Sequence, residues 1–142
     1  MKILFVPSDN NFVSGAFRSM CTLNKILNDK FKIQTLVVLP NKMGNGFKLL
    51  DELNIKYTYI ESFNWIVKSD RELTKEQHNQ ILIEQEKNGD AINKLVELIK
   101  KEKIDIIHIN TTYSYVAAIA GQITNTPVIW HLREFLEEDQ KR

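Results

Sequence analysis

Short apolar runs alternate with segments of helical periodicity along most of this chain. Continuous apolar runs of four to seven residues are typical of strands covered on both faces, and apolar residues at three- and four-residue spacing are typical of helices. We predict strands at residues 2–7, 33–39, 56–60, 105–110 and 128–131. We predict helices from Gly15 onward and at residues 46–53, 90–103 and 114–123. Strands separated by helices form right-handed βαβ crossovers, so the pattern predicts an α/β fold with a parallel sheet flanked by helices.

The middle of the chain departs from this pattern. Residues 62–71 show no clean period, and residues 74–88 are polar enough to form either an exposed helix or a long loop. The strongest helical pattern follows in residues 90–103, where four aliphatic residues form a single stripe and lysines gather toward the end. We expect a helix there.

Composition narrows the class of protein. With 19 basic and 18 acidic side chains the net charge is +1, which gives no general case for nucleic-acid binding. Cys21 is the single cysteine, so an intrachain disulfide is impossible. Its place in an apolar stripe indicates a buried structural residue in a reducing compartment. No run approaches the roughly 20 apolar residues that cross a bilayer, and we expect a cytoplasmic protein that is at most peripheral to a membrane.

Length and the final residues bear on domain organisation. The 142 residues fit one domain spanning 1–142. Residues 134–142 are acidic and then basic, like the start of a helix that the chain does not finish. We therefore expect the chain to be a piece of a longer protein.

A polar loop follows the first predicted strand and leads into the helix that opens at Gly15. A glycine at such a turn lets a ligand approach the backbone closely, and free amides at a helix N-terminus can receive a phosphate. Ser14 is also a favourable cap residue, and taken alone the turn is better explained by capping. Gly44-Asn45-Gly46, after the second strand, lacks the spacing of a dinucleotide-binding motif, so we interpret it as a loop before a helix.

Hydroxyl and amide side chains cluster directly after the fourth predicted strand. They are Asn110, Thr111, Thr112, Tyr113, Ser114 and Tyr115. Such groups can hydrogen-bond a polyol such as a sugar, and Thr112 or Ser114 can equally cap the following helix. The sequence leaves both interpretations open.

The fifth predicted strand is a short buried run that stops at His131, with Arg133 and Glu134 behind it. Histidine titrates near neutral pH, and α/β sheets bind ligands beyond the carboxyl ends of their strands. Strands one, four and five should end at the same edge of a parallel sheet. We therefore expect Gly15, residues 110–113 and His131 to converge on one crevice. A histidine satisfied at a strand end, beside a surface ion pair, is the alternative.

An apolar and basic stretch lies outside the regular pattern. It consists of Phe63, Trp65, Ile66, Val67, Lys68 and Arg71. We interpret it as a satellite cluster packed over the sheet, with contact to a membrane or an acceptor as the minority hypothesis.

Four short motifs, in this order and spacing, resemble the N-terminal domain of the family 4 glycosyltransferases, retaining enzymes of the GT-B fold that use nucleotide-sugar donors. They are Lys2-Ile3-Leu4-Phe5-Val6, Ser14-Gly15-Ala16-Phe17-Arg18-Ser19, Asp105-Ile106-Ile107-His108-Ile109-Asn110, and Pro127-Val128-Ile129-Trp130-His131 with Arg133-Glu134. The resemblance covers nearly the whole chain but only the first half of such an enzyme. It implies a Rossmann-like, acceptor-side domain whose partner, a C-terminal donor-binding domain, is absent from this chain.

The resemblance also implies roles for individual residues. In that family the glycine of the first loop lies close to the donor's phosphates, and the histidine after the fifth strand sits by the transferred sugar. We accordingly assign donor-phosphate binding to Ser14 and Gly15, and a catalytic role to His131. We assign substrate binding to residues 110–113, Arg133 and Glu134. The family usually has two glycines at the first turn, whereas Ser14 stands at the first of those positions here.

The implied function is sugar transfer from a nucleotide-sugar to a glycan, lipid or other acceptor, as in polysaccharide biosynthesis. The resemblance implies no metal and no cofactor besides the donor, and residues 1–142 are expected to be inactive alone. One alternative is half of a nucleotide-sugar epimerase. Another is a non-catalytic flavodoxin-like binding module, which would show an acidic cluster at the tips of strands one and three; only Asp9 is available near strand one.

Overall fold

The computed structural model describes residues 1–65 and 72–132. Within them, strands and helices alternate almost as the hydrophobic pattern predicts. In chain order the elements are β1 (Lys2–Val6), α1 (Gly15–Asp29), β2 (Gln34–Leu39), α2 (Phe47–Glu52), β3 (Tyr57–Tyr59), α3 (Lys75–Glu102), β4 (Ile106–Ile109), α4 (Val116–Thr124) and β5 (Val128–Trp130).

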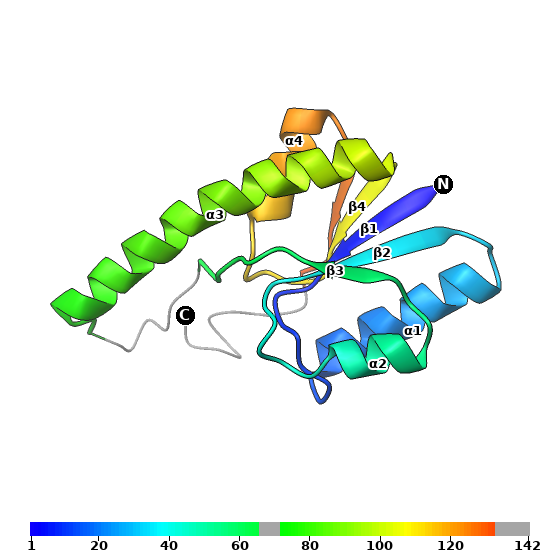
Figure 1. Ribbon diagram of the computed structural model, residues 1–142, viewed down its shortest axis with the longest axis horizontal. Coiled ribbons are helices and arrows are strands. Elements are labelled where there is room, and N and C mark those ends of the chain that lie inside the picture. The colour runs from blue at the N-terminus through cyan, green and yellow to red at the C-terminus, as the bar shows by residue number, and fades with distance from the viewer. Residues whose placement is uncertain (66–71, 133–142) are drawn as a thin grey trace.

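The strands form one parallel sheet in the order β3-β2-β1-β4-β5 (Figure 1). β1 is central, and its Leu4 lies in register between Leu36 of β2 and Ile107 of β4. Because every pair is parallel, the carboxyl ends of all five strands lie along one edge of the sheet. The predicted α/β fold with a parallel sheet flanked by helices is confirmed.

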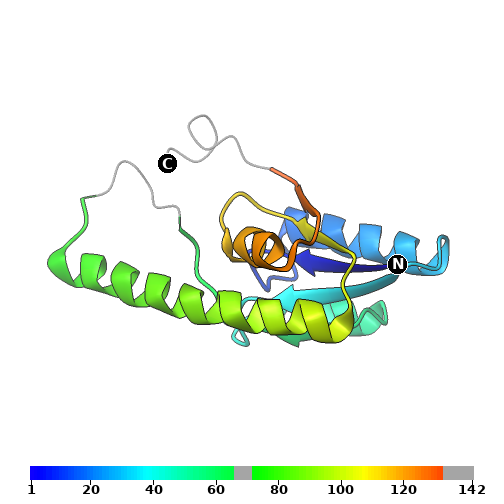
Figure 2. The same cartoon turned by 90° about the horizontal axis from the view of Figure 1, so that it is seen from above.

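Alternating side chains of the sheet build one apolar core on each face. α1 and α2 cover one face, and α3 and α4 cover the other (Figure 1, Figure 2). Phe5 and Val37 pack with α1, whereas Leu4 and Ile107 pack with α3 and α4. Full burial of each such side chain stabilises the fold by about 1.5–3 kcal/mol. The two cores therefore hold the helices in place against the sheet. Cys21 lies in the first core, fully buried, as its apolar spacing indicated.

The middle of the chain resolves an alternative that the sequence left open. Residues 75–102 form one continuous helix, α3, so residues 74–88 follow the exposed-helix alternative and the helix predicted at residues 90–103 is the second half of α3. It begins with a capping box in which Thr74 and Gln77 satisfy each other's backbone amides. Asn88, which interrupts the apolar period, is fully buried and binds the backbone of Phe63. The first half of α3 extends beyond the sheet (Figure 2).

The fifth strand differs from the prediction. β5 ends at Trp130, so it stops at His131 as predicted, but it lies at the edge of the sheet, and its side chains are half-buried or exposed where the sequence predicted a buried strand. Ile129 is 53% exposed because, among the described residues, β5 pairs with β4 alone and no helix covers this side chain. An apolar run shows that a strand forms, but it does not tell an edge strand from a central one.

Candidate functional site

The residues that follow β1, β4 and β5 lie at one edge of the sheet. Val6, Ile109 and Trp130 are in register across the three strands. The amide of Asn110 donates to the carbonyl of Val6 at 3.0 Å, and the amide of His131 donates to the carbonyl of Ile109 at 2.8 Å. The parallel pairing therefore continues one residue past the strands. This carboxyl edge is where open α/β sheets bind their ligands.

The turn before α1 contributes a helix N-terminus to the carboxyl edge. Ser14 is the N-cap: its Oγ accepts a hydrogen bond from the amide of Phe17 at 3.3 Å. The amides of Gly15 and Ala16 in the first turn have no intrahelical acceptor, because a helix leaves its first amides unpaired. Ser14 thus has the capping role that the turn, taken alone, predicted. The neighbouring amides are of the kind that binds an anion.

Gly15 is exposed, and the fold does not require a glycine there. A Cβ at this position would meet no atom within 4 Å, and Gly15 adopts an ordinary helical conformation. Gly44 and Gly46 are different, since a Cβ on either would come within 3 Å of Asn10. Open space in front of Gly15 leaves room for a ligand to approach the helix N-terminus.

Asn10 fixes the loop after β1, and its role was not apparent from the sequence. It is 3% exposed; its Nδ2 donates to the carbonyl of Asn41 at 3.0 Å, and its Oδ1 accepts from the amide of Phe47 at 2.9 Å. The amide of Gly46 donates to the carbonyl of Asn10 at 3.3 Å. Gly44-Asn45-Gly46 is therefore the loop before α2, as predicted, and its glycines allow the two loops to pack closely. Only these long-range contacts distinguish Asn10 from its polar neighbours.

The hydroxyl-rich segment after β4 is partly built into the fold. Asn110 and Thr111 are each 1% exposed. Nδ2 of Asn110 donates to the carbonyl of Ala16 at 3.0 Å, which ties the tip of β4 to the first turn of α1. Oγ1 of Thr111 accepts from the amide of Tyr113 at 3.0 Å. In this structure the side chains of Asn110 and Thr111 position the edge, while Thr112 and Tyr113 are half-exposed.

Trp65 packs against this segment. Its amide donates to the carbonyl of Tyr113 at 3.1 Å, and its Nε1 donates to the carbonyl of Thr112 at 2.9 Å. The indole also contacts the ring of Tyr115, with centroids 5.3 Å apart. Trp65 therefore packs on the segment after β4, and it stays 50% exposed. Ile66, Val67, Lys68 and Arg71 lie outside the described residues.

His131 is an exposed residue directly past β5. Its ring meets that of His108 edge-on, with centroids 5.8 Å apart and planes at 85°. His108 on β4 is nearly buried, and its ring packs against that of Phe5 with the two centroids 4.8 Å apart. The fold thus holds the backbone of His131 to β4 and leaves its imidazole accessible at the carboxyl edge. Arg133 and Glu134, also predicted for this site, lie outside the described residues.

Three further observations bear on what this chain can bind. In residues 1–65 and 72–132, no three His, Cys, Asp or Glu side chains gather in a group that could hold a metal ion. Burial raises the pKa of the Cys21 thiol to about 11, so the thiol stays protonated at neutral pH and is a poor nucleophile. In the same residues no helix is long and apolar enough to span a membrane.

No family model and no curated protein matches the sequence. Solved structures do match the fold. MurG from Acinetobacter baumannii superposes with a TM-score of 0.65 at 18% identity, over 92% of this chain and 34% of MurG. The lipopolysaccharide outer core galactosyltransferase WaaB gives a TM-score of 0.64 at 12% identity, over 99% of this chain and 36% of WaaB.

A protein assigned as a UDP-N-acetylglucosamine 2-epimerase from Listeria monocytogenes gives a TM-score of 0.58 at 14% identity, over 91% of this chain and 30% of that one. This chain therefore spans about a third of the length of the proteins whose fold it shares. At these identities the likeness concerns the fold, and the fold is that of the Rossmann-like half of GT-B glycosyltransferases.

Proposed function

We propose that this chain is the N-terminal, acceptor-side domain of a GT-B glycosyltransferase. The observation that carries the proposal is the arrangement of one edge of the sheet, where the N-terminus of α1, the segment after β4 and His131 follow three neighbouring strands. The likeness to the glycosyltransferase WaaB supports it. Membership of family 4 and a retaining outcome are the finer parts of the proposal, and they rest on the resemblance of the sequence motifs.

The N-terminus of α1 is proposed to face the leaving group. Sugar transfer develops negative charge on the departing diphosphate, and preorganised amides stabilise such charge without reorganising during the reaction. The amides of Gly15 and Ala16 point out of the first turn, where the 15-residue helix adds a positive partial charge. Because Gly15 has open space around it, a phosphate oxygen can come within hydrogen-bond distance of the backbone.

His131 is proposed to contact the transferred sugar. Its backbone bond to Ile109 and its ring contact with His108 restrict the imidazole, while the ring remains exposed. A ring nitrogen can then orient a sugar hydroxyl or stabilise the positive charge that develops on the sugar. Thr112 and Tyr113, the half-exposed residues of the neighbouring segment, are proposed to bind substrate hydroxyls, with Arg133 and Glu134 as further substrate contacts.

A second domain is required by this proposal. The described residues offer one side of a site, and the matched proteins are about three times as long. A C-terminal domain in the same protein is proposed to bind the nucleotide of the donor, a nucleotide-sugar that carries a hexose. Residues 1–142 alone are proposed to be inactive. No metal is proposed, since the helix N-terminus supplies positive potential. The proposed acceptor is a glycan or a lipid-linked sugar in the cytoplasm, including the cytoplasmic face of the membrane.

The test joins residues 1–142 to the proposed C-terminal domain and measures sugar transfer from a panel of labelled nucleotide-sugars. Incorporation into an acceptor, absent with residues 1–142 alone, is the expected result. The match to the Listeria protein keeps epimerisation as a second candidate. Interconversion of the donor's sugar without any acceptor would replace the proposed transfer by epimerisation. If neither reaction occurs, the remaining hypothesis is a binding module.

A further inference from the structure

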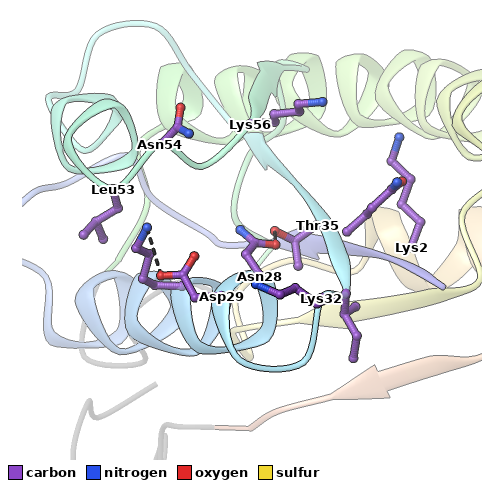
Figure 3. Close-up of a pocket in the computed structure, with 11 residues that line it drawn as sticks. Lys2, Asn28, Asp29, Lys32, Thr35, Leu53, Asn54 and Lys56 are labelled. Atoms are coloured by element: carbon purple, nitrogen blue, oxygen red, sulfur yellow. Dashed lines mark hydrogen bonds and ion pairs between the residues drawn. The ribbon is translucent and has the colours of Figure 1, made fainter.

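A cavity of about 370 Å³ lies at the opposite edge of the sheet, where the strands begin (Figure 3). Its walls come from the start of β1 and β2, the C-terminal end of α1, and the turn between α2 and β3. Four lysines line it: Lys2, Lys25, Lys32 and Lys56. We call it the lysine cavity. None of the predicted site residues lines it, so it is separate from the carboxyl edge.

The charge of the lysine cavity is positive. Asp29 is the carboxylate in its lining, and it pairs with Lys25 at 3.1 Å. Lys2 pairs at 2.6 Å with Glu102, which lies outside this lining. Among the described residues, Lys32 and Lys56 make no ion pair. A hydrogen bond from Lys2, together with the charges of neighbouring lysines that include Lys56, lowers the pKa of Glu102 from its ordinary value.

A neutral donor complements these charges. Oδ1 of Asn28 accepts a hydrogen bond from Oγ1 of Thr35 at 3.0 Å, and both residues line the cavity (Figure 3). This bond fixes which way the amide faces. Among the described residues, Nδ2 of Asn28 donates to no other atom, so it is available to an acceptor in the cavity.

Lys32 has a backbone conformation that is uncommon for a lysine. It follows the C-terminal end of α1 with a φ of 56°, in the left-handed region where glycine and asparagine are favoured. Lys103, at the end of α3, has the same conformation with a φ of 54°. The conformation costs a side-chain-bearing residue about 1 kcal/mol. Asn54, across the cavity, has a φ of 57°, but asparagine adopts this region readily. The fold therefore presents a charged side chain where a small residue would be more stable.

We propose that the lysine cavity binds a small phosphate-bearing anion. Lysines act as point charges that suit phosphate, whereas planar carboxylates are matched by the fork of arginine, and no arginine lines the cavity. The volume lies at the lower end of the range for ligand pockets, which suits a small ligand. The site is independent of the proposed sugar transfer at the carboxyl edge.

The test titrates inorganic pyrophosphate into the chain at low ionic strength and follows the backbone amide resonances of Thr35 and Asn54. Saturable shifts are expected. Replacing both unpaired lysines, Lys32→Gln with Lys56→Gln, is expected to weaken binding at least about tenfold, because each charged contact is lost. Lys48→Gln with Lys75→Gln changes the net charge equally at exposed sites elsewhere and is expected to change affinity less than about twofold.

A second variant tests the geometry. Asn28→Asp keeps an acceptor for Thr35 but replaces the Nδ2 donor by a negative charge, and it is expected to abolish binding in a chain whose thermal unfolding remains cooperative. Three results would overturn the proposal: no saturable shift, equal weakening by the control pair, or binding only to phosphatidylserine vesicles. With no shift, the lysines would serve only to offset the negative partial charge at the C-terminal ends of α1 and α2.

Discussion

The two edges of the sheet offer anions different chemistry. At the carboxyl edge the helix N-terminus of α1 supplies backbone amides, and buried residues such as Asn10 and Asn110 set the loops in place. The opposite edge, where the strands begin, is the amino edge. The C-terminal ends of α1 and α2 lie there with negative partial charges, and lysine side chains supply the positive charge. On these two proposals, backbone amides would bind an anion at one edge of the parallel sheet, and side chains would bind one at the other edge. The two edges should respond to different substitutions.

The largest expected effect is on catalysis at the carboxyl edge. In the protein joined to its proposed donor-binding domain, His131→Ala should lower turnover about a hundredfold, the size seen when one transition-state hydrogen bond is removed. Stability should not change, because the side chain is exposed. His78→Ala, on the exposed first turn of α3, is the matched control. Equal turnover in the two variants would remove His131 from the site.

The next effect is on the loops that build this edge. Asn10→Ala removes two side-chain hydrogen bonds and leaves the amide of Phe47 and the carbonyl of Asn41 without their partner. We expect the free energy of unfolding to fall by about 2 kcal/mol in urea denaturation. Asn79→Ala, at an exposed position of α3, should change it by less than about 0.5 kcal/mol. A similar small loss for both would show that Asn10 does not hold the loops.

A smaller effect separates stability from function at the N-terminus of α1. Gly15→Ala introduces no clash and replaces a flexible helical residue, so the free energy of unfolding should stay equal or rise by up to about 1 kcal/mol. Turnover should nevertheless fall about tenfold, since the methyl group keeps the donor's phosphate from the backbone. Gly89→Ala, also in a helix with open space around it, should leave turnover unchanged. Unaltered turnover in Gly15→Ala would show that no ligand approaches there.

The smallest expected effect concerns the amino edge. Lys32→Gln with Lys56→Gln should leave transfer within about twofold of the parent protein, because the lysine cavity lies at the edge of the sheet away from His131. The measurement is the same transfer assay without added pyrophosphate. A tenfold loss of transfer activity would mean that the two edges are coupled, and it would contradict their independence.

Much of the fold could be predicted from the sequence, because the spacing of hydrophobic residues indicates which side chains are buried on folding. It placed β1, β2 and β4 and the helix that follows each of β1 and β4 within a few residues. It left the first half of α3 undecided between helix and loop, because Asn88 interrupts the apolar stripe but forms buried hydrogen bonds with Phe63. The partner that makes Asn88 acceptable is 25 residues away in the sequence. No local pattern contains that contact.

The position of the candidate residues along one edge of the sheet was predictable to a similar degree. The topology of parallel strands placed Gly15, residues 110–113 and His131 at a common edge, since strand tips need no side-chain detail to be located. Which of these side chains face solvent was not predictable: Asn110 and Thr111 are buried by contacts with α1 and their own loop. The lysine cavity was also missed, because its residues come from three stretches of the chain, at residue 2, residues 25–35 and residues 53–56.

The central claim is that a donor's diphosphate meets the N-terminus of α1, and glycine labelling tests it most directly. Residues 1–142 contain five glycines, and Gly15 is the one in the first turn of α1. In the joined protein labelled with ¹⁵N-glycine, the signal that Gly15→Ala removes should shift when the nucleotide-sugar is added. Turnover with that signal unmoved at saturating donor would contradict the account.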